Sequence, residues 1–142
     1  MRQFNEVLAE LMLENNYSLE RLARKIGVKR VTISRWKSGK QTVLLSNAVK
    51  LANCFGCSLE YLTGRTNIKL DFKLRDCPPF YDRLKNVMSN RGVTRYRVAK
   101  DSAFSESSFD SWSKGSDPLL RTIIDLADYF GLTIDAFIGR EK

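Results

Sequence analysis

The segment around residue 30 carries side chains that are well suited to hydrogen bonding with a polar partner. Arg30, Ser34 and Lys37 follow helical spacing, and Val31 and Arg35 lie beside them. Because a guanidinium donates two parallel hydrogen bonds to the edge of guanine, and Val31 could meet the methyl group of thymine, this face has the chemistry to read bases. Charges of this kind are also typical of the solvated face of an ordinary surface helix, so the surrounding sequence has to decide.

Few residues in the chain could support catalysis or hold a metal. Histidine is absent from the sequence, which removes the commonest general base and every zinc site with a histidine ligand. Cys54 and Cys57 form a CxxC pair, but a structural zinc needs four ligands and only Cys77 remains. The pair also ends a helix, whereas redox dithiols usually begin one, so we expect buried structural thiols. We predict no enzymatic activity, no cofactor and no metal site.

The excess positive charge lies in the first half of the chain. Residues 1–75 contain fourteen Lys and Arg against six Asp and Glu, whereas residues 76–142 contain ten of each. A basic domain attracts polyanions, usually nucleic acid, although a generic basic protein would share this balance. No apolar run approaches the roughly 20 residues of a membrane span, and the N-terminus has no signal-peptide character. We therefore expect a cytoplasmic protein with no membrane contact and no small-molecule ligand.

Two copies of one sequence pattern make up the chain. A shift of 76 residues brings the first copy into register with the second as far as Gly39, and after one deletion in a loop the shift is 75. The pairs include Leu8 with Leu84, Ala23 with Ala99, Trp36 with Trp112, Ala52 with Ala127 and Gly56 with Gly131. Each copy has about 60 residues, near the lower size limit for a domain that folds alone. We predict two domains, residues 1–64 and 80–142, joined by a linker of residues 65–79.

Apolar residues recur at helical spacing in both copies and predict five short helices in each. In the first copy the helices cover residues 3–15, 18–25, 29–37, 42–55 and 58–63, with Ser18 and Thr42 as N-caps, Gly27 in the turn, and Ile33 and Trp36 in the core. In the second copy they cover residues 80–91, 94–101, 105–113, 118–130 and 133–138, and Asp117-Pro118 marks the start of the fourth. The predicted fold class is therefore all-α.

Within the linker, the residues from Ile68 to Leu74 alternate between apolar and charged types, as a half-buried strand does. A lone strand leaves its backbone hydrogen bonds unmade, so this segment could pair with the same segment of a second chain and form a dimer. The alternative is an extended linker whose apolar face lies against a domain. The alternation alone does not separate the two interpretations.

Residues 18–40 resemble the helix-turn-helix of the Cro/C1-type (XRE) repressor family. The matching features are Leu22-Ala23 in the first motif helix, Gly27 at the turn, and Ile33-Ser34-Arg35-Trp36 followed by Gly39. Leu51-Ala52 and residues 58–64 resemble the closing helices of the family, and the similarity recurs more weakly over residues 80–139. The resemblance implies two tandem five-helix domains of the lambda-repressor-like fold. It also implies a transcriptional repressor that binds double-stranded DNA with helix 29–37 in the major groove.

The resemblance assigns roles to individual residues as well. The base-reading positions fall on Arg30, Val31, Ser34 and Arg35, and the phosphate-contact positions fall on Ser18, Lys29, Ser38, Lys40 and Thr42. One departure is Leu19, which stands where the family often has a glutamine bonded to the DNA backbone. That contact is lost here, or is made only by the backbone N–H of Leu19.

The second copy lacks the basic face of the first. Glu106 replaces Arg30 and Asp110 replaces Ser34, and carboxylates close to phosphates are repelled. We expect this domain to serve mainly in dimerisation or partner binding. Basic residues near the preceding helix could still touch the DNA backbone, namely Arg91, Arg95, Arg97 and Lys100. A homodimer would bind a near-palindromic operator, and a single chain that read DNA with both domains would bind an asymmetric one. The alternative function is a protein-interaction adaptor, or an antitoxin-like partner-binding protein, that keeps the fold without specific DNA readout.

Overall fold

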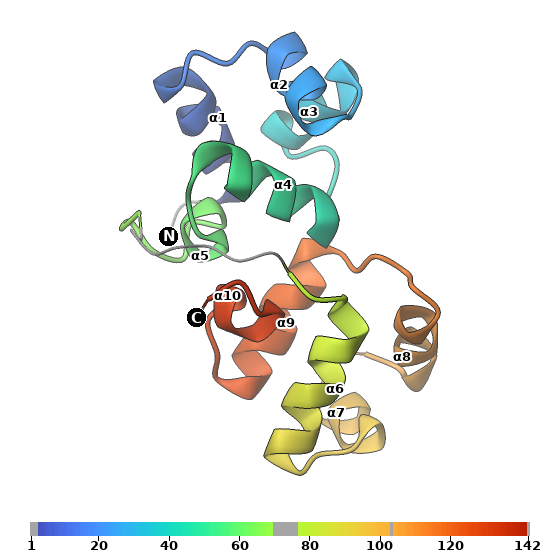
Figure 1. Cartoon of the computed structure of the whole chain (residues 1–142). Helices are drawn as coiled ribbons and strands as arrows, with labels where there is room; N and C mark the ends of the chain where they lie inside the picture. Colours follow the sequence, from blue (N-terminus) through green and yellow to red (C-terminus); the bar gives the residue numbers. More distant parts are fainter. Residues whose placement is uncertain (1–2, 70–76, 103, 142) are drawn as a thin grey trace. The chain divides into compact units, whose positions relative to one another are not determined.

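The computed structural model describes residues 3–69, 77–102 and 104–141. In chain order the helices are α1 (Phe4–Glu14), α2 (Leu19–Ile26), α3 (Arg30–Ser38), α4 (Leu45–Phe55), α5 (Leu59–Leu62), α6 (Phe80–Arg91), α7 (Arg95–Asp101), α8 (Glu106–Ser113), α9 (Leu120–Phe130) and α10 (Ile134–Ile138). Helices α1–α5 form one compact unit, and α6–α10 lie mainly in a second (Figure 1). No strand occurs over the described ranges, so the prediction of an all-α fold with two five-helix domains is confirmed.

The predicted linker strand falls largely outside the described part of the chain. Residues 70–74 of that strand are among the residues not described. Ile68, at its beginning, is exposed and lies in a bend. Pairing of this segment with a second chain therefore stays a prediction.

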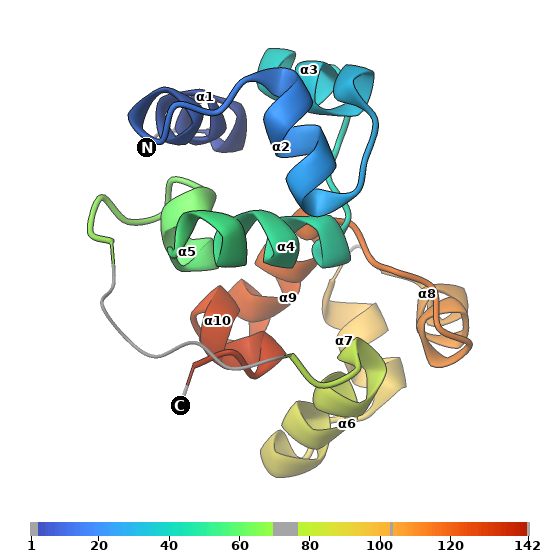
Figure 2. The same cartoon turned by 45° about the horizontal axis from the view of Figure 1, so that its top comes forward.

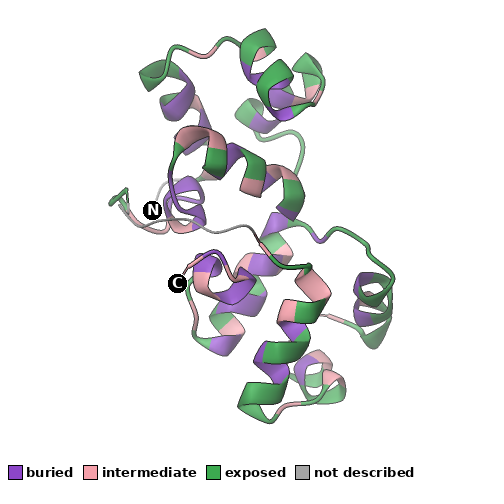
Figure 3. Ribbon diagram, viewed as in Figure 1, coloured by how far each residue is buried: buried purple, intermediate pink, exposed green. Residues whose placement is uncertain are grey.

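The first unit is held together by the apolar sides of its five helices, which face one interior (Figure 3). Its fully buried side chains include Leu8, Leu11, Leu22, Ile33, Ala48, Leu51 and Leu62. Removing a large aliphatic side chain from water contributes about 1.5–3 kcal/mol, so this set is the main source of stability in so small a unit. Trp36 is also buried, so the prediction that Ile33 and Trp36 lie in the core is confirmed.

The corner between α2 and α3 is fixed by local sequence. The Oγ atom of Ser18 accepts a hydrogen bond from the backbone N–H of Arg21 at 3.1 Å, which caps the start of α2 as predicted. Gly27 ends α2 with φ of 80°, a left-handed conformation that glycine adopts without steric cost. The chain then turns into α3, so that the two helices pack side by side at a fixed angle (Figure 2).

The second unit repeats this plan with its own residues. Thr94 caps α7 by accepting a hydrogen bond from the N–H of Arg97 at 3.2 Å, in the place that Ser18 holds in the first unit. The core contains Leu84, Val98, Phe109, Leu126, Phe137 and other apolar side chains. The repeat found in the sequence is therefore also a repeat in structure.

The fourth helix of each unit begins later than the sequence predicts. Thr42 is not the N-cap of α4, because the backbone at Leu44 is extended, with φ of −80° and ψ of 154°. Likewise, α9 begins at Leu120 and not at Pro118. Val43 and Pro118, each two residues before the first residue of its helix, are buried. Burying an apolar side chain outweighs the roughly 1 kcal/mol of an N-cap hydrogen bond, so apolar contacts set the helix start.

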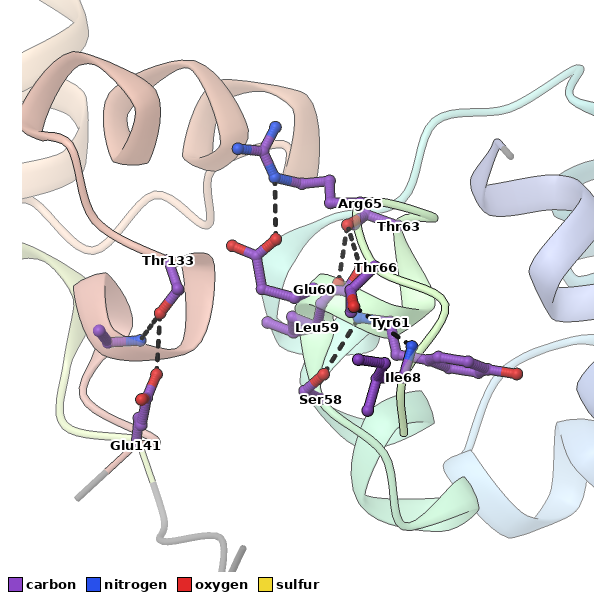
Figure 4. Close-up of polar contacts among 11 residues, drawn as sticks. Ser58, Leu59, Glu60, Tyr61, Thr63, Arg65, Thr66, Ile68, Thr133 and Glu141 are labelled. Atoms are coloured by element: carbon purple, nitrogen blue, oxygen red, sulfur yellow. Dashed lines mark hydrogen bonds and ion pairs between the residues drawn. The ribbon is translucent and has the colours of Figure 1, made fainter. Parts of the chain in front are cut away.

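The last helix of each unit is short and has an N-cap, and an ion pair joins it to the segment that follows. Around α5, Ser58 caps the helix, and Arg65 Nε lies 3.0 Å from Glu60 Oε2 (Figure 4). Around α10, Thr133 caps the helix and also donates a hydrogen bond to Glu141 (Figure 4). There the ion pair joins Arg140 and Asp135, which occupy the repeat positions of Arg65 and Glu60. Both domains therefore tie the end of their last helix to the segment after it.

Candidate nucleic-acid interface

Helix α3 is held by one side and leaves the other side open. Ile33 and Trp36 are buried on its inner side, and α3 packs against both α1 and α2. The outer side carries the four predicted base-reading residues, Arg30, Val31, Ser34 and Arg35, all of which are exposed. Even the apolar member, Val31, has 49% of its surface exposed. A rigid helix thus presents these side chains to solvent, as insertion into a groove would require.

Three of these residues share one open depression on the surface. Arg30, Val31 and Ser34 line it from α3, and Leu19 lines it from the start of α2. Arg35 lies outside this depression. The guanidinium groups of Arg30 and Arg35 form no hydrogen bond or ion pair with any side chain in the described part of the protein. Both are therefore available to an external acceptor.

The five predicted phosphate-contact residues are also exposed, namely Ser18, Lys29, Ser38, Lys40 and Thr42. Ser18 uses an oxygen lone pair to cap α2, so its hydroxyl proton can still donate to a phosphate. The hydroxyl of Ser38 already donates to the carbonyl oxygen of Arg35 at 3.2 Å. A phosphate contact by Ser38 would therefore have to replace that internal hydrogen bond.

The structure shows a second basic surface, which the resemblance to the family does not predict. Arg21, Arg24 and Lys25 line an open depression together with Tyr17, on the outer side of α2. The guanidinium of Arg21 stacks 4.8 Å from the centre of the Tyr17 ring and donates to the carbonyl oxygen of Asn16. The concentration of positive charge in the first half of the sequence was the signal that could have found this surface.

The phenol of Tyr17 contacts one of the three cysteines. Cys54 Sγ lies 3.4 Å from Tyr17 Oη, and this hydrogen bond, together with burial, raises the pKa of Tyr17 above its ordinary value. Cys54 is half-buried, so the expectation of a buried thiol is only partly met there. Cys57 is fully buried, as predicted. In the described part of the chain no group of three or more Cys, Asp or Glu side chains is placed to hold a metal ion.

On the matching surface of the second unit, an arginine and an aspartate bind each other. Arg95 stands at the repeat position of Leu19, and its Nη2 atom lies 2.5 Å from Asp110 Oδ1 and 3.0 Å from the carbonyl oxygen of Glu106. Its guanidinium also lies 5.5 Å from the centre of the Phe109 ring. The hydrogen bond from Arg95 lowers the pKa of Asp110 below the ordinary carboxyl range. We call this set the Arg95 clasp, and it ties α7 to the outer face of α8.

A second internal ion pair lies on the same unit. Arg97 Nε lies 2.8 Å from Asp101 Oδ2, and Tyr129 donates its phenolic proton to the same oxygen at 3.0 Å. Burial and this hydrogen bond raise the pKa of Tyr129. The repeat places Lys25 of the first unit at the Asp101 position, so no carboxylate neutralises Arg21 there. The two units therefore share a fold, but the second unit pairs arginines with carboxylates where the first unit leaves its basic side chains without a carboxylate partner.

Among the helices that the structure describes, none is both long enough and apolar enough to cross a bilayer.

Two family models match the chain, one in each half. A helix-turn-helix model matches residues 8–62, and a model of the Cro/C1-type HTH DNA-binding domain matches residues 83–142. The chain is similar to a solved transcriptional regulator from Listeria innocua, with 20% sequence identity and a TM-score of 0.43, over 69% of this chain and 84% of that one. It is also similar to a chain of a SinR protein/SinI protein complex, with 20% identity and a TM-score of 0.40, over 80% of this chain and 100% of that one. No curated protein matches the chain. The two matched ranges contain the α2–α3 and α7–α8 pairs.

Proposed function

Because the chain belongs to the Cro/C1-type helix-turn-helix family, with one such domain in each half, we propose that it is a transcriptional repressor that acts in the cytoplasm and reads duplex DNA through α3. Helix-turn-helix domains bind DNA by placing the second motif helix in the major groove. In this chain the first domain supplies that helix, and it also carries the excess positive charge.

The observation that carries the proposal is the contrast between α3 and α8. The outer face of α3 holds two arginines that no described side chain neutralises. The same face of α8 holds two acidic residues, and one of them is bound by the Arg95 clasp. Uncompensated guanidinium groups on a rigid exposed helix suit bidentate contact with guanine. Specific readout is therefore assigned to the first domain, through Arg30, Val31, Ser34 and Arg35, with phosphate contacts from Ser18, Lys29, Ser38, Lys40 and Thr42.

Specific binding by one such domain needs a second copy. A single domain makes few base contacts, and family members normally bind two half-sites about one helical turn apart. The acidic face of α8, one of whose carboxylates is bound by the Arg95 clasp, supports a homodimer that uses two first domains, with the second domain serving in dimerisation or in binding a partner protein. Such a dimer would select a near-palindromic operator.

The test is selection of duplexes from a random pool by the full-length chain, followed by gel-shift titration on the enriched sequence. The R30A/R35A variant should lose preference for that sequence over competitor DNA. A matched control is R91A/R121A, which removes two exposed arginines outside α2 and α3 and should keep the preference. If R30A/R35A bound the enriched site with unchanged selectivity, the proposed reading helix would be wrong.

The salt dependence of binding separates a repressor from an adaptor that only retains the fold. Displacing counterions from phosphates makes the affinity for DNA fall steeply as salt rises. A repressor should combine a steep slope with a preference for one sequence over competitor DNA. A chain that showed neither property would be assigned to protein binding instead.

A further inference from the structure

The depression beside α3 is lined by both aliphatic and polar side chains. The proposed contact of Arg30 with a base involves only the polar part of this lining. Two of its four lining residues, Leu19 and Val31, are aliphatic, and the other two are Arg30 and Ser34. Val31 is about half exposed and Leu19 is partly exposed, so both aliphatic side chains can be reached from solvent. Exposed aliphatic side chains next to a guanidinium can contact an apolar group of the base edge that the guanidinium binds.

The second domain shows what another side chain does at the position of Leu19. Arg95 reaches across from α7 and bonds to the Asp110 carboxylate and the Glu106 carbonyl on α8. These groups stand at the repeat positions of Ser34 and Arg30. A long side chain at this position therefore binds polar groups on the outer face of α8, although that face stays exposed to solvent. Leucine is too short and too apolar to form such a bridge, and it leaves the depression open.

We propose that Leu19 and Val31 together form a binding site for the 5-methyl group of a thymine, directly beside the base read by Arg30. Thymine is the only standard DNA base with a methyl group in the major groove, and aliphatic side chains are its usual contacts. Arg30 prefers guanine, and Val31 is its neighbour in the chain. Each half-site should therefore contain a thymine adjacent to a guanine. This inference rests on the proposed function, and it makes Leu19 a specificity-determining residue.

The size of the effect follows from the burial of one methyl group. Excluding a single methyl or methylene group from water changes an equilibrium about fourfold. Replacing the thymine with deoxyuracil removes only the methyl group and preserves both base pairing and the O4 acceptor. Replacement of one particular thymine of a half-site by deoxyuracil should therefore lower the affinity of the wild-type chain about fourfold.

The experiment uses the full-length chain and the duplex enriched from the random pool, with deoxyuracil placed at each thymine in turn. For the wild type, one thymine beside a guanine should show the fourfold ratio of dissociation constants. In L19A and in L19A/V31A that ratio should fall towards one, while the preference for the adjacent guanine remains. The control is L13A, which makes the same change at a leucine of α1 that is 80% exposed, and it should keep the wild-type ratio. Because the readout is a ratio within each variant, a general loss of active protein would not change it.

Two results would overturn the inference alone. One is a wild-type chain that binds thymine and deoxyuracil equally at every position of the enriched duplex. The other is a fourfold ratio that persists in L19A. If instead the random pool gave no enriched sequence, the proposed function would fail, and this inference would fail with it.

Discussion

The two lysines that border α3 offer the sharpest quantitative test of the phosphate contacts proposed for the first domain. Lys29 precedes the helix, Lys40 follows it, and both are exposed. Neither forms an ion pair in the described part of the structure, so each can neutralise one phosphate. The slope of log affinity against log salt changes by about 0.9 for each phosphate contact. The K29A/K40A variant should therefore bind with a slope that is shallower by about 1.8 for each bound domain.

This change in slope has a direct consequence for affinity. Between 50 and 200 mM salt, the wild type should lose about 12-fold more affinity than K29A/K40A for each bound domain. Because phosphate contacts carry no sequence information, the two proteins should prefer the same sequence. Fluorescence anisotropy with a labelled duplex at four or five salt concentrations would measure the slope.

A matched control and a clear contrary result complete the test. The K85A/K114A variant removes two exposed lysines from the second domain and should keep the wild-type slope. If K29A/K40A also kept the wild-type slope, these lysines would not contact phosphates, and the orientation of α3 in the groove would have to be revised. A loss of sequence preference in K29A/K40A would contradict the division between phosphate contacts and base contacts.

Three further predictions concern the fold and the second domain. Replacing the fully buried Ile33 by alanine should lower the free energy of unfolding by about 2–5 kcal/mol, measured by urea denaturation, and a loss below about 1 kcal/mol would be inconsistent with its burial. Reversing the charges of Glu106 and Asp110 should change the affinity for the preferred duplex by less than about twofold in gel-shift titration, and an altered sequence preference would show that α8 reads DNA. Because Arg95 lowers the pKa of Asp110 in the folded state, the pair stabilises the fold above the ordinary carboxyl pKa and loses this effect as the pH falls through the lowered value. An NMR titration of the Asp110 carboxyl should therefore have its midpoint below that of an unpaired aspartate, and R95L should raise it; an unchanged midpoint in R95L would disprove the clasp.

The parts of the fold that depend on periodicity and on short-range caps could be predicted from the sequence. Ser18 and Gly27 act on their own backbone neighbourhood, and the burial of Ile33 and Trp36 follows from helical spacing. The start of α4 could not be predicted in this way, because Thr42 looks like a good N-cap. Its role was overridden by the burial of an apolar neighbour, which is a property of the packed structure.

The candidate site was also only partly within reach of sequence reasoning. The exposure of Arg30 and Arg35 follows from the same spacing that buries Ile33. The Arg95 clasp was missed because Arg95 and Asp110 lie on different helices, and only their packing brings the two side chains to 2.5 Å. Interactions between helices depend on side-chain reach in three dimensions, and a linear pattern of residue types does not contain that information.

Under the proposed function, the acidic face of α8 has a consequence for how gene expression would respond to the amount of protein. A chain with one open reading helix can occupy only one of two half-sites, so full occupancy of an operator recruits two chains. If the chains are mainly separate before they bind, occupancy at low concentration rises with the square of the chain concentration. Two acidic residues of the second domain, Glu106 and Asp110, would thereby help to convert a gradual dose response into a steep one.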